Sequence, residues 1–396
     1  MTDIIPATVD VPVGDPFSAP QTKAAARTMT LHLKVQPNAW PWLDQAAREV
    51  NVAWNWANET CRKAVQTYVG PAKWLRAYDL DALAAGSGGE FRRIGIDVVQ
   101  RINAELATRR KQFKKVSLRF RASGGRKRAL GWIPFKAANL RVKGNRLTFM
   151  GKSIRLFQMD RFLEFRSNGK LRSGNFAQNS LGEWFLNVAV DAPYPEGTTF
   201  DDRGNPRLPV APIEKLGIDL GLKSIVATSE GEVFEPNRSY REAETKLGQL
   251  QRSGHNKQTK RLHLTIKNRR LDRMHKLTRY LVTQAQWIHI GDVSLKFLAA
   301  GKRAKSAHDA APGLFKTLLK YKGHWAGRTV HDVDERHTTQ TCGACHARTG
   351  PKGLRGLRVR QWTCTACGVV HERDVNSACL IKAAAPRCRR PLAGTR

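Results

Sequence analysis

Two pairs of cysteines, each with the spacing Cys-x-x-Cys, constrain the C-terminal third of this chain more than any other feature. Cys342 and Cys345 form the first pair, and Cys364 and Cys367 form the second pair after 18 intervening residues. Four thiolates at this spacing can close a tetrahedral zinc site, and a site closed by four protein ligands is structural. The sequence therefore predicts one structural Zn²⁺ ion in a zinc ribbon over residues 341–368.

The chain also carries a large excess of positive charge. Its 396 residues include 68 Lys and Arg against 33 Asp and Glu, which gives a formal net charge of +35. Such a charge repels itself unless a polyanion neutralises it, so nucleic acid is the expected partner. The excess is spread along the chain and includes Arg355, Arg358 and Arg360 of the ribbon, which we expect to lie along nucleic acid.

An anionic membrane surface is the competing partner for a basic protein. The sequence has no run of about 20 apolar residues and no signal peptide, so we expect no membrane association. Paired Cys-x-x-Cys units suit a reducing compartment with a bound metal better than a disulfide scaffold. These features predict a cytoplasmic location.

The N-terminal half is predicted to be a strand-rich domain interrupted by helices. Residues 1–27 lack periodicity and are expected to be a disordered lead-in. Alternating polar and apolar residues predict strands within residues 28–39 and 114–192, including SLRFR at 117–121. Between residues 40 and 113, apolar positions recur at spacings of three and four, which predicts a helical insert. The expected structure is a basic antiparallel β-barrel with this insert.

A different pattern follows a linker rich in Pro and Gly at residues 193–213. There the predicted order is strand, strand, strand, helix, strand, helix, strand, which is the order of an RNase H-like fold. We expect this α/β domain to occupy residues 214–340 and 369–384, with the ribbon inserted between them. A basic tail is expected at residues 385–396, and the fold class of the whole chain is multidomain α+β.

Two aspartates occupy positions from which a carboxylate can reach a shared metal ion. Asp219 lies among apolar residues on the first strand of the α/β domain, where burying a carboxylate is costly and a bound cation would remove the cost. Asp374 directly follows the ribbon and opens a helix. Either aspartate by itself is weak evidence for a metal site, since aspartates at the start of a helix often act only as helix caps. Together with the predicted fold, the pair indicates a metal-dependent site.

Residues 28–384 resemble the TnpB family, transposon-associated relatives of type V CRISPR effectors with an OrfB-type zinc ribbon. The matching segments are GIDLGLKSIVATS, IHIGDVS, TTQTCGAC, WTCTACG, HERDVNSA, GWIPFKAANLRVKGNRLTF and SGNFAQNSLGEWFLNVAV. The resemblance implies that a wedge-like barrel and a helical recognition insert hold a transposon-derived guide RNA and recognise a short target-adjacent motif. It further implies a RuvC domain that hydrolyses double-stranded target DNA, with two Mg²⁺ ions held by an Asp, Glu, Asp set.

The same resemblance implies a Mg²⁺-dependent endodeoxyribonuclease that is monomeric within its ribonucleoprotein and associated with the nucleoid of a prokaryote. In the family pattern Asp219 is the first acid and Asp374 is the last. The middle glutamate is missing, because this chain has Gly291 followed by Asp292 where other members have Glu followed by Asp.

Two residues are candidates for the missing middle acid. Asp292 is shifted by one residue along its strand and should point to the opposite face, so a strand-end turn or cap is the simpler interpretation. Glu335 ends the fifth strand, which in this fold lies beside the fourth at about 5 Å, so its side chain can reach the vacated position. Some family members look similar because they carry both the Gly-Asp-Val that begins here at Gly291 and the Glu-Arg that begins at Glu335. This resemblance implies that the middle acid has moved to position 335. The predicted catalytic and Mg²⁺-binding set is Asp219, Glu335 and Asp374.

Two other functions remain open on sequence alone. A chain without a working middle acid would be a nuclease-dead, RNA-guided repressor that occupies DNA, which Gly291 favours and Glu335 opposes. A conventional transposase that joins strands is the third possibility. It is disfavoured because a ribbon between the fifth strand and the last acid is typical of the guided nucleases.

Overall fold

The computed structural model describes residues 26–66, 74–86, 90–167, 169–194, 198–200, 206–207, 211–236, 238–292, 309–356 and 358–385. The predicted lead-in at residues 1–27 and the predicted tail at 385–396 lie almost entirely outside these residues. The fold is mixed α and β, and the chain divides into two compact units, Met1–Tyr194 and Pro195–Arg396. No described helix is both long enough and apolar enough to cross a membrane.

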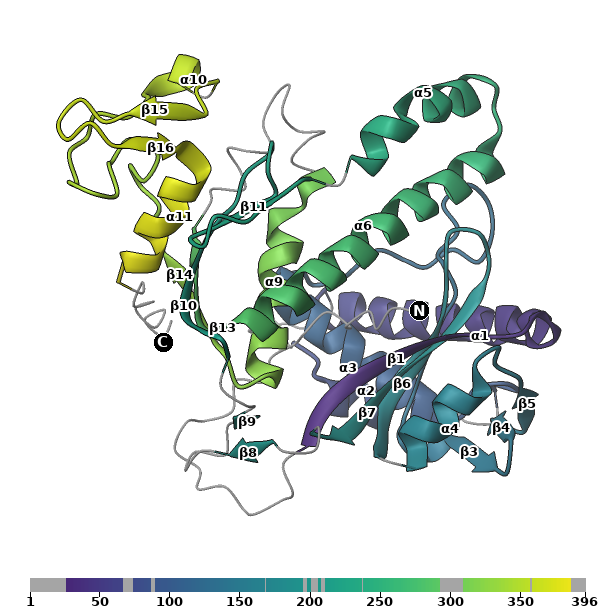
Figure 1. Ribbon diagram of the computed structural model, residues 1–396. Coiled ribbons are helices and arrows are strands. Elements are labelled where there is room, and N and C mark those ends of the chain that lie inside the picture. Colours follow the sequence, from purple (N-terminus) through teal and green to yellow (C-terminus); the bar gives the residue numbers. More distant parts are fainter. Residues whose placement is uncertain are drawn as a thin grey trace. The chain divides into compact units, whose positions relative to one another are not determined.

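The first unit contains two antiparallel sheets and four α-helices among its described residues (Figure 1). One sheet has the strand order β1-β7-β6-β2, and the other has the order β3-β4-β5. Helices α1, α2 and α3 all lie within the segment predicted to be a helical insert. The bounds are β1 (Ala26–Lys34), α1 (Trp40–Gln66), α2 (Ala77–Leu83), α3 (Ile96–Phe113), β2 (Trp132–Phe135), β3 (Leu140–Lys143), β4 (Arg146–Phe149), β5 (Lys152–Ile154), α4 (Met159–Ser167), β6 (Lys170–Gln178) and β7 (Trp184–Pro193).

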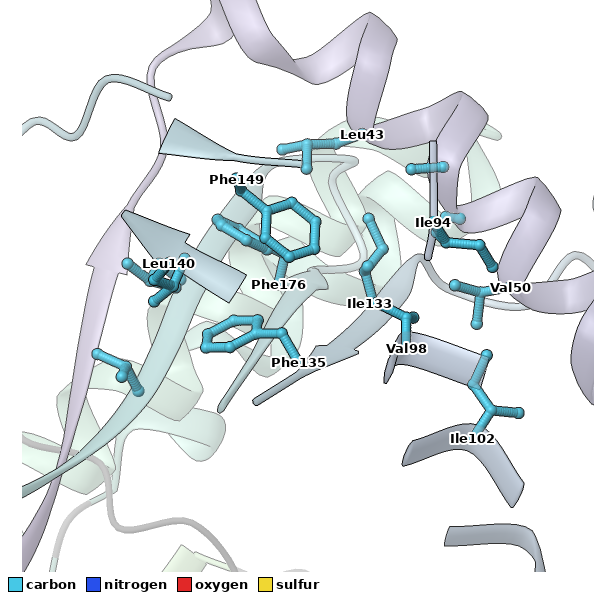
Figure 2. Packing of buried hydrophobic residues seen from close by; sticks show 14 of the residues in the cluster. Leu43, Val50, Ile94, Val98, Ile102, Ile133, Phe135, Leu140, Phe149 and Phe176 are labelled. Atoms are coloured by element: carbon cyan, nitrogen blue, oxygen red, sulfur yellow. The ribbon is translucent and has the colours of Figure 1, made fainter. Parts of the chain in front are cut away.

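A single apolar core joins the two sheets and the helices of the first unit. Figure 2 shows three aromatic rings, Phe135 from β2, Phe149 from β4 and Phe176 from β6, gathered between the strands and the helices. Their ring centroids lie 5.1–5.8 Å apart in tilted pairs. Such pairs add about 0.5–1.5 kcal/mol beyond the burial of their surface. The phenylalanines therefore fix the three-stranded sheet against the larger one.

The strand predicted at residues 117–121 is wrong. This segment belongs to no sheet, and side chains of α1 pair with its backbone instead. Asn58 donates to the carbonyl of Leu118 at 2.7 Å and accepts from its amide at 2.8 Å. Asn55 does the same for Arg121, at 3.0 and 2.7 Å. Because each asparagine amide donates once and accepts once here, it satisfies an extended backbone as a neighbouring strand would.

The second unit is built around a mixed sheet of five strands in the order β12-β11-β10-β13-β14. Strand β10 pairs antiparallel with β11 and parallel with β13, which is itself parallel to β14. The predicted order of strands and helices is confirmed, but the helix predicted between the third and fourth strands is broken at residues 253–255 into α5 and α6. The bounds are β10 (Ile213–Asp219), β11 (Val226–Thr228), β12 (Val233–Phe234), α5 (Ser239–Arg252), α6 (Asn256–Gln284), β13 (Ala285–Gly291), α9 (Pro312–Trp325), β14 (Thr329–Val333) and α11 (Arg373–Ala383).

Shorter elements complete the described part of the second unit. A small hairpin, β8 (Thr199–Phe200) with β9 (Pro206–Arg207), lies within the predicted linker. The cysteine-containing segment holds α10 (Gly353–Gly356) and the antiparallel pair β15 (Gln361–Thr363) and β16 (Val370–Glu372). Strand β16 runs directly into α11, so the cysteine-containing segment and α11 are joined without a loop.

Strand alternation gives the five-stranded sheet two different faces. Apolar side chains such as Leu216, Ile218 and Ile288 point to the face covered by α6 and α9. On the other face a Cβ atom at Gly217 would overlap the backbone of α11, so this glycine allows the helix to lie directly on the sheet. Figure 1 shows α11 on one side of the sheet and α9 with α6 on the other. Asp219, two residues after Gly217, therefore faces α11.

Candidate metal centres

The four cysteines converge as the sequence predicts. Their sulfur atoms all lie within 4.8 Å of one another, with 3.7 Å between Cys342 and Cys367 and 3.5 Å between Cys345 and Cys364. Four sulfurs that each lie 2.3 Å from one tetrahedral ion are separated by about 3.8 Å. The cluster therefore fits a Zn²⁺ ion in both donor chemistry and size.

Two further side chains contact these sulfurs. The Nε2 atom of His371 lies 2.9 Å from the sulfur of Cys342, and the hydroxyl of Thr349 donates to the sulfur of Cys364 at 3.2 Å. Hydrogen bonds to a coordinating thiolate are typical of the outer shell of metal sites. Apart from these contacts the described part of the ribbon has little core of its own, because its buried apolar cluster consists of Cys342, Trp362 and Cys364.

A second group of side chains brings three carboxylates from distant segments to the α11 side of the sheet. Asp219 ends β10, Glu335 lies two residues after β14, and Asp374 lies in the first turn of α11. Asp219 interacts electrostatically with both of the others, because the charges of Glu335 and Asp374 each act on its ionisation. The three acids predicted from the sequence are thus neighbours in the folded chain.

The pKa of Asp219 reflects the negative charges that lie close to it. Burial, followed by the charges of Glu335 and Asp374, raises the pKa of Asp219 to about 8, and Arg373 opposes this only in part. Like-charged carboxylates near a buried acid favour its neutral form unless a cation compensates them. A cation bound between the three acids would compensate this charge and favour the ionised form of Asp219.

Gly291 and Glu335 are fitted to each other. Gly291 ends β13, directly opposite Val333 of β14 in the parallel pairing. A Cβ atom placed on Gly291 would lie well inside van der Waals contact with Oε2 of Glu335, and 3.1 Å from Cδ1 of Ile381. The carboxylate of Glu335 therefore occupies the space that a side chain at position 291 would need.

Asp292 lies elsewhere. Its carboxylate is 3.4 Å from Nζ of Lys316, a residue of α9 on the opposite face of the sheet. Lys316 also lies 3.8 Å from Asp332, so Asp292 belongs to a group of ion pairs under α9. This agrees with the interpretation of Asp292 as a strand-end residue.

Asp374 is held by two residues that sequence reasoning did not assign to this site. Nη1 of Arg360 donates to both carboxylate oxygens, at 3.0 and 2.7 Å, and the hydroxyl of Ser224 donates to Oδ2 at 2.8 Å. Arg360 lies between the two cysteine pairs, so the ribbon reaches the carboxylate group directly. The helix cap is a different acid, because Glu372 accepts from the amide of Val375. Asp374 is therefore not needed as a cap.

The raised pKa of Asp219 predicts a pH-dependent affinity for divalent ions. Binding must displace the proton of Asp219, so Mg²⁺ affinity should fall about tenfold for each pH unit below about 8. In the metal-free chain the unfolded carboxyl ionises near pH 3.9, so this group lowers stability increasingly as pH rises from about 4 to about 8. Calorimetric Mg²⁺ titrations at pH 6, 7 and 8 measure the effect, and an affinity independent of pH in the native chain would contradict it. Asp219→Asn, which has no proton to release, is the control.

Two family models match the second unit. Residues 203–300 match OrfB_IS605, described as a probable transposase, and this region includes Asp219 and Gly291. Residues 313–381 match the Cas12f1-like TNB domain, and this region includes Glu335, Asp374 and all four ribbon cysteines. The two matched regions therefore contain every residue of both candidate metal centres.

Similar proteins and structures cover different shares of the chain. A Streptomyces pristinaespiralis protein named as an RNA-guided DNA endonuclease is 36% identical over 225 residues, which are 52% of this chain and 51% of that protein. Escherichia coli K12 InsQ, with the same functional name, is 28% identical over 234 residues, 52% of this chain and 54% of that protein. The chain thus spans about half the length of the curated relatives it matches.

The fold resembles that of a solved complex. A cryo-EM structure of a Cas12f1–sgRNA–target DNA complex aligns with a TM-score of 0.53, over 88% of this chain and 84% of that chain. The sequence identity in this alignment is 12%. At 12% identity, the alignment shows a similarity of fold alone.

Proposed function

We propose that this chain is a TnpB-type, RNA-guided, Mg²⁺-dependent DNA endonuclease, which its matches to the OrfB_IS605 model over residues 203–300 and the Cas12f1-like TNB model over residues 313–381 support. The second unit is proposed to be an RNase H-like domain of the RuvC type, with the zinc ribbon inserted before α11. The described sheet order and the ribbon position support this. In the first unit, the wedge-like barrel and the recognition insert are proposed to hold the guide RNA.

The observation that carries the proposal is the fit of Glu335 against Gly291. Residues that hold catalytic metal ions must supply enough carboxylates, and two aspartates alone would be marginal. Because Glu335 fills the space beside Gly291 and acts on Asp219 electrostatically, it supplies the third carboxylate from a neighbouring strand. Asp219, Glu335 and Asp374 are the proposed catalytic, Mg²⁺-binding residues.

The proposed chemistry is hydrolysis of a DNA phosphodiester. Two bound Mg²⁺ ions would activate the attacking water and stabilise the leaving oxygen. Asp219, Glu335 and Asp374 would hold these ions, and Ser224 orients the carboxylate of Asp374 through its hydroxyl. Arg360 fixes the position of that carboxylate by pairing with both of its oxygens. Base pairing with the guide RNA would select the sequence, while the protein recognises the short adjacent motif.

The proposed partners follow from charge and likeness. A net charge of +35 suits a chain that binds a guide RNA and a DNA duplex together. The aligned Cas12f1 structure is itself described as a complex with sgRNA and target DNA. We also propose that the protein is a monomer within the ribonucleoprotein and acts in the cytoplasm.

The experiment that tests the function starts from RNA bound by the chain. The protein is copurified with RNA expressed from its own locus, the RNA is sequenced, and the complex is incubated with matching DNA and Mg²⁺. We expect cleavage of matching DNA alone, and no cleavage by Asp219→Asn. Guide-dependent DNA binding without any cleavage would contradict the proposal.

One observation favours a second candidate, an RNA-guided repressor without nuclease activity. Gly291 stands where the resemblance leads us to expect a glutamate, and loss of that acid is the simplest route to an inactive site. The retained cluster of Asp219, Glu335 and Asp374 favours the nuclease instead, because a chain released from catalysis has no reason to keep three neighbouring acids whose charges oppose one another.

A further inference from the structure

Asn376 lies at the junction between α11 and the segment that leads from Glu335 to the first cysteine pair. It is two residues after Asp374, and it is buried, with 4% of its surface exposed. The side-chain oxygen accepts from the amide of Gly343 at 2.8 Å. The side-chain nitrogen donates to the carbonyls of Thr341 at 2.8 Å and Thr338 at 3.4 Å. One buried amide thus binds three backbone groups of a single connecting segment.

The far end of this connecting segment is Glu335. Thr338 donates to the carbonyl of Glu335 through both its amide, at 3.3 Å, and its hydroxyl, at 2.9 Å. Asn376 in turn binds the carbonyl of Thr338. A short path of hydrogen bonds therefore runs from the backbone of Glu335 to the helix that carries Asp374, although the two acids are far apart in sequence.

The near end of the segment is the first cysteine pair. Gly343 lies between Cys342 and Cys345, and a Cβ atom there would approach the side-chain oxygen of Asn376 to 2.8 Å. A glycine at this position lets the amide of Asn376 approach the turn that holds two zinc ligands. The same side chain therefore contacts the zinc-binding turn and the segment that positions Glu335.

We propose that Asn376 is a positioning residue that holds Glu335 and Asp374 at the separation a shared divalent ion requires, using the zinc-binding turn as its anchor. This rests on the proposed function, because it assigns those two acids to one ion site. Asparagine suits the task because its side chain provides both donors and an acceptor. Aspartate would keep only the acceptor, and alanine would leave the backbone groups of the buried turn without partners.

Mn²⁺ binding to the full chain, followed by electron paramagnetic resonance without nucleic acid, tests this role separately from cleavage. We expect Asn376→Ala to weaken Mn²⁺ binding about tenfold or more, as loss of an outer-shell partner does, with zinc still near one ion per chain. The matched control is Ser377→Ala. Ser377 is on the same helix and fully buried, and its hydroxyl has no hydrogen bond within the described structure, so its replacement should leave Mn²⁺ affinity unchanged.

A second variant keeps the test decisive if Asn376→Ala loses zinc or fails to fold. Gly343→Ala retains all four cysteines and Asn376 but pushes the amide away from the turn, and it should also weaken Mn²⁺ binding several-fold. The inference would be overturned if a folded, zinc-loaded Asn376→Ala chain bound Mn²⁺ as tightly as the native chain. If that variant fails to fold or loses zinc, native Mn²⁺ affinity in Gly343→Ala would overturn it.

Cleavage of guided DNA, measured on the same samples, separates this inference from the proposed function. A native chain that binds Mn²⁺ without cutting contradicts the nuclease proposal, while the comparison of Asn376→Ala with Ser377→Ala still decides the positioning role. Cutting by the native chain together with unchanged Mn²⁺ affinity in Asn376→Ala contradicts the positioning role alone. A native chain that binds no Mn²⁺ contradicts both.

Discussion

Replacement of Glu335 by glutamine is expected to reduce cleavage of guided DNA on the order of 10³-fold while leaving guided DNA binding intact. The substitution keeps the shape of the side chain beside Gly291 but removes one of three negative charges around the proposed ions. Metal ions supply several kcal/mol of transition-state stabilisation, and about 1.4 kcal/mol corresponds to a tenfold change in rate. Single-turnover cleavage of a matching duplex in saturating Mg²⁺ measures the loss.

Asp292→Asn is the matched control for this prediction. It makes the same acid-to-amide change at the residue next to Gly291, but Asp292 pairs with Lys316 on the α9 side of the sheet. Cleavage by this variant should stay near the native rate. Two outcomes would show that the third acid has been assigned to the wrong residue. One is cleavage at the native rate by Glu335→Gln, and the other is loss of cleavage in Asp292→Asn but not in Glu335→Gln.

Loss of zinc is expected to have the second large effect. Cys364→Ser should reduce zinc from about one ion per chain to nearly none, and cleavage should fall on the order of 100-fold or more. Among its described residues the ribbon has a small buried cluster to hold it without metal, yet it carries Arg360, which binds Asp374. An unfolded ribbon would therefore release the carboxylate of α11 from its partner. Metal analysis and cleavage are measured on the same preparation.

Cys379→Ser provides the comparison for the zinc experiment. Cys379 is an exposed cysteine on α11 that lies outside the four-cysteine cluster. Both its zinc content and its cleavage rate should match those of the native chain. Full activity in a Cys364→Ser chain shown to contain no zinc would mean that the ribbon does not support the carboxylate site.

The second unit was largely predictable because its signals are local. Apolar runs marked the strands, and the order of strands and helices was sufficient to place β14 beside β13. The position of Glu335 followed from that pairing, since the end of one strand lies close to the end of its neighbour. The cysteine spacing predicted the ribbon for the same reason, because ligand spacing is a property of short segments.

Contacts made between distant segments were not predictable. Arg360 and Ser224 meet at Asp374 from positions 14 and 150 residues away, and no periodicity marks either residue. The residues at 117–121 alternate like a strand, yet their backbone is paired by Asn55 and Asn58 of α1. Alternation records which side chains are buried, and it does not identify the partner that satisfies the backbone.

The most direct test of the central claim is to move the acid back. In the double variant Gly291→Glu with Glu335→Ala, the new carboxylate starts from β13 and the side chain that blocks it has been shortened. Glu335→Ala alone should be inactive, and Gly291→Glu alone should be impaired because the two side chains compete for one space. The account predicts that the double variant cleaves guided DNA about 10-fold to 100-fold faster than Glu335→Ala. A double variant no faster than Glu335→Ala, although folded and bound to guided DNA, would contradict it.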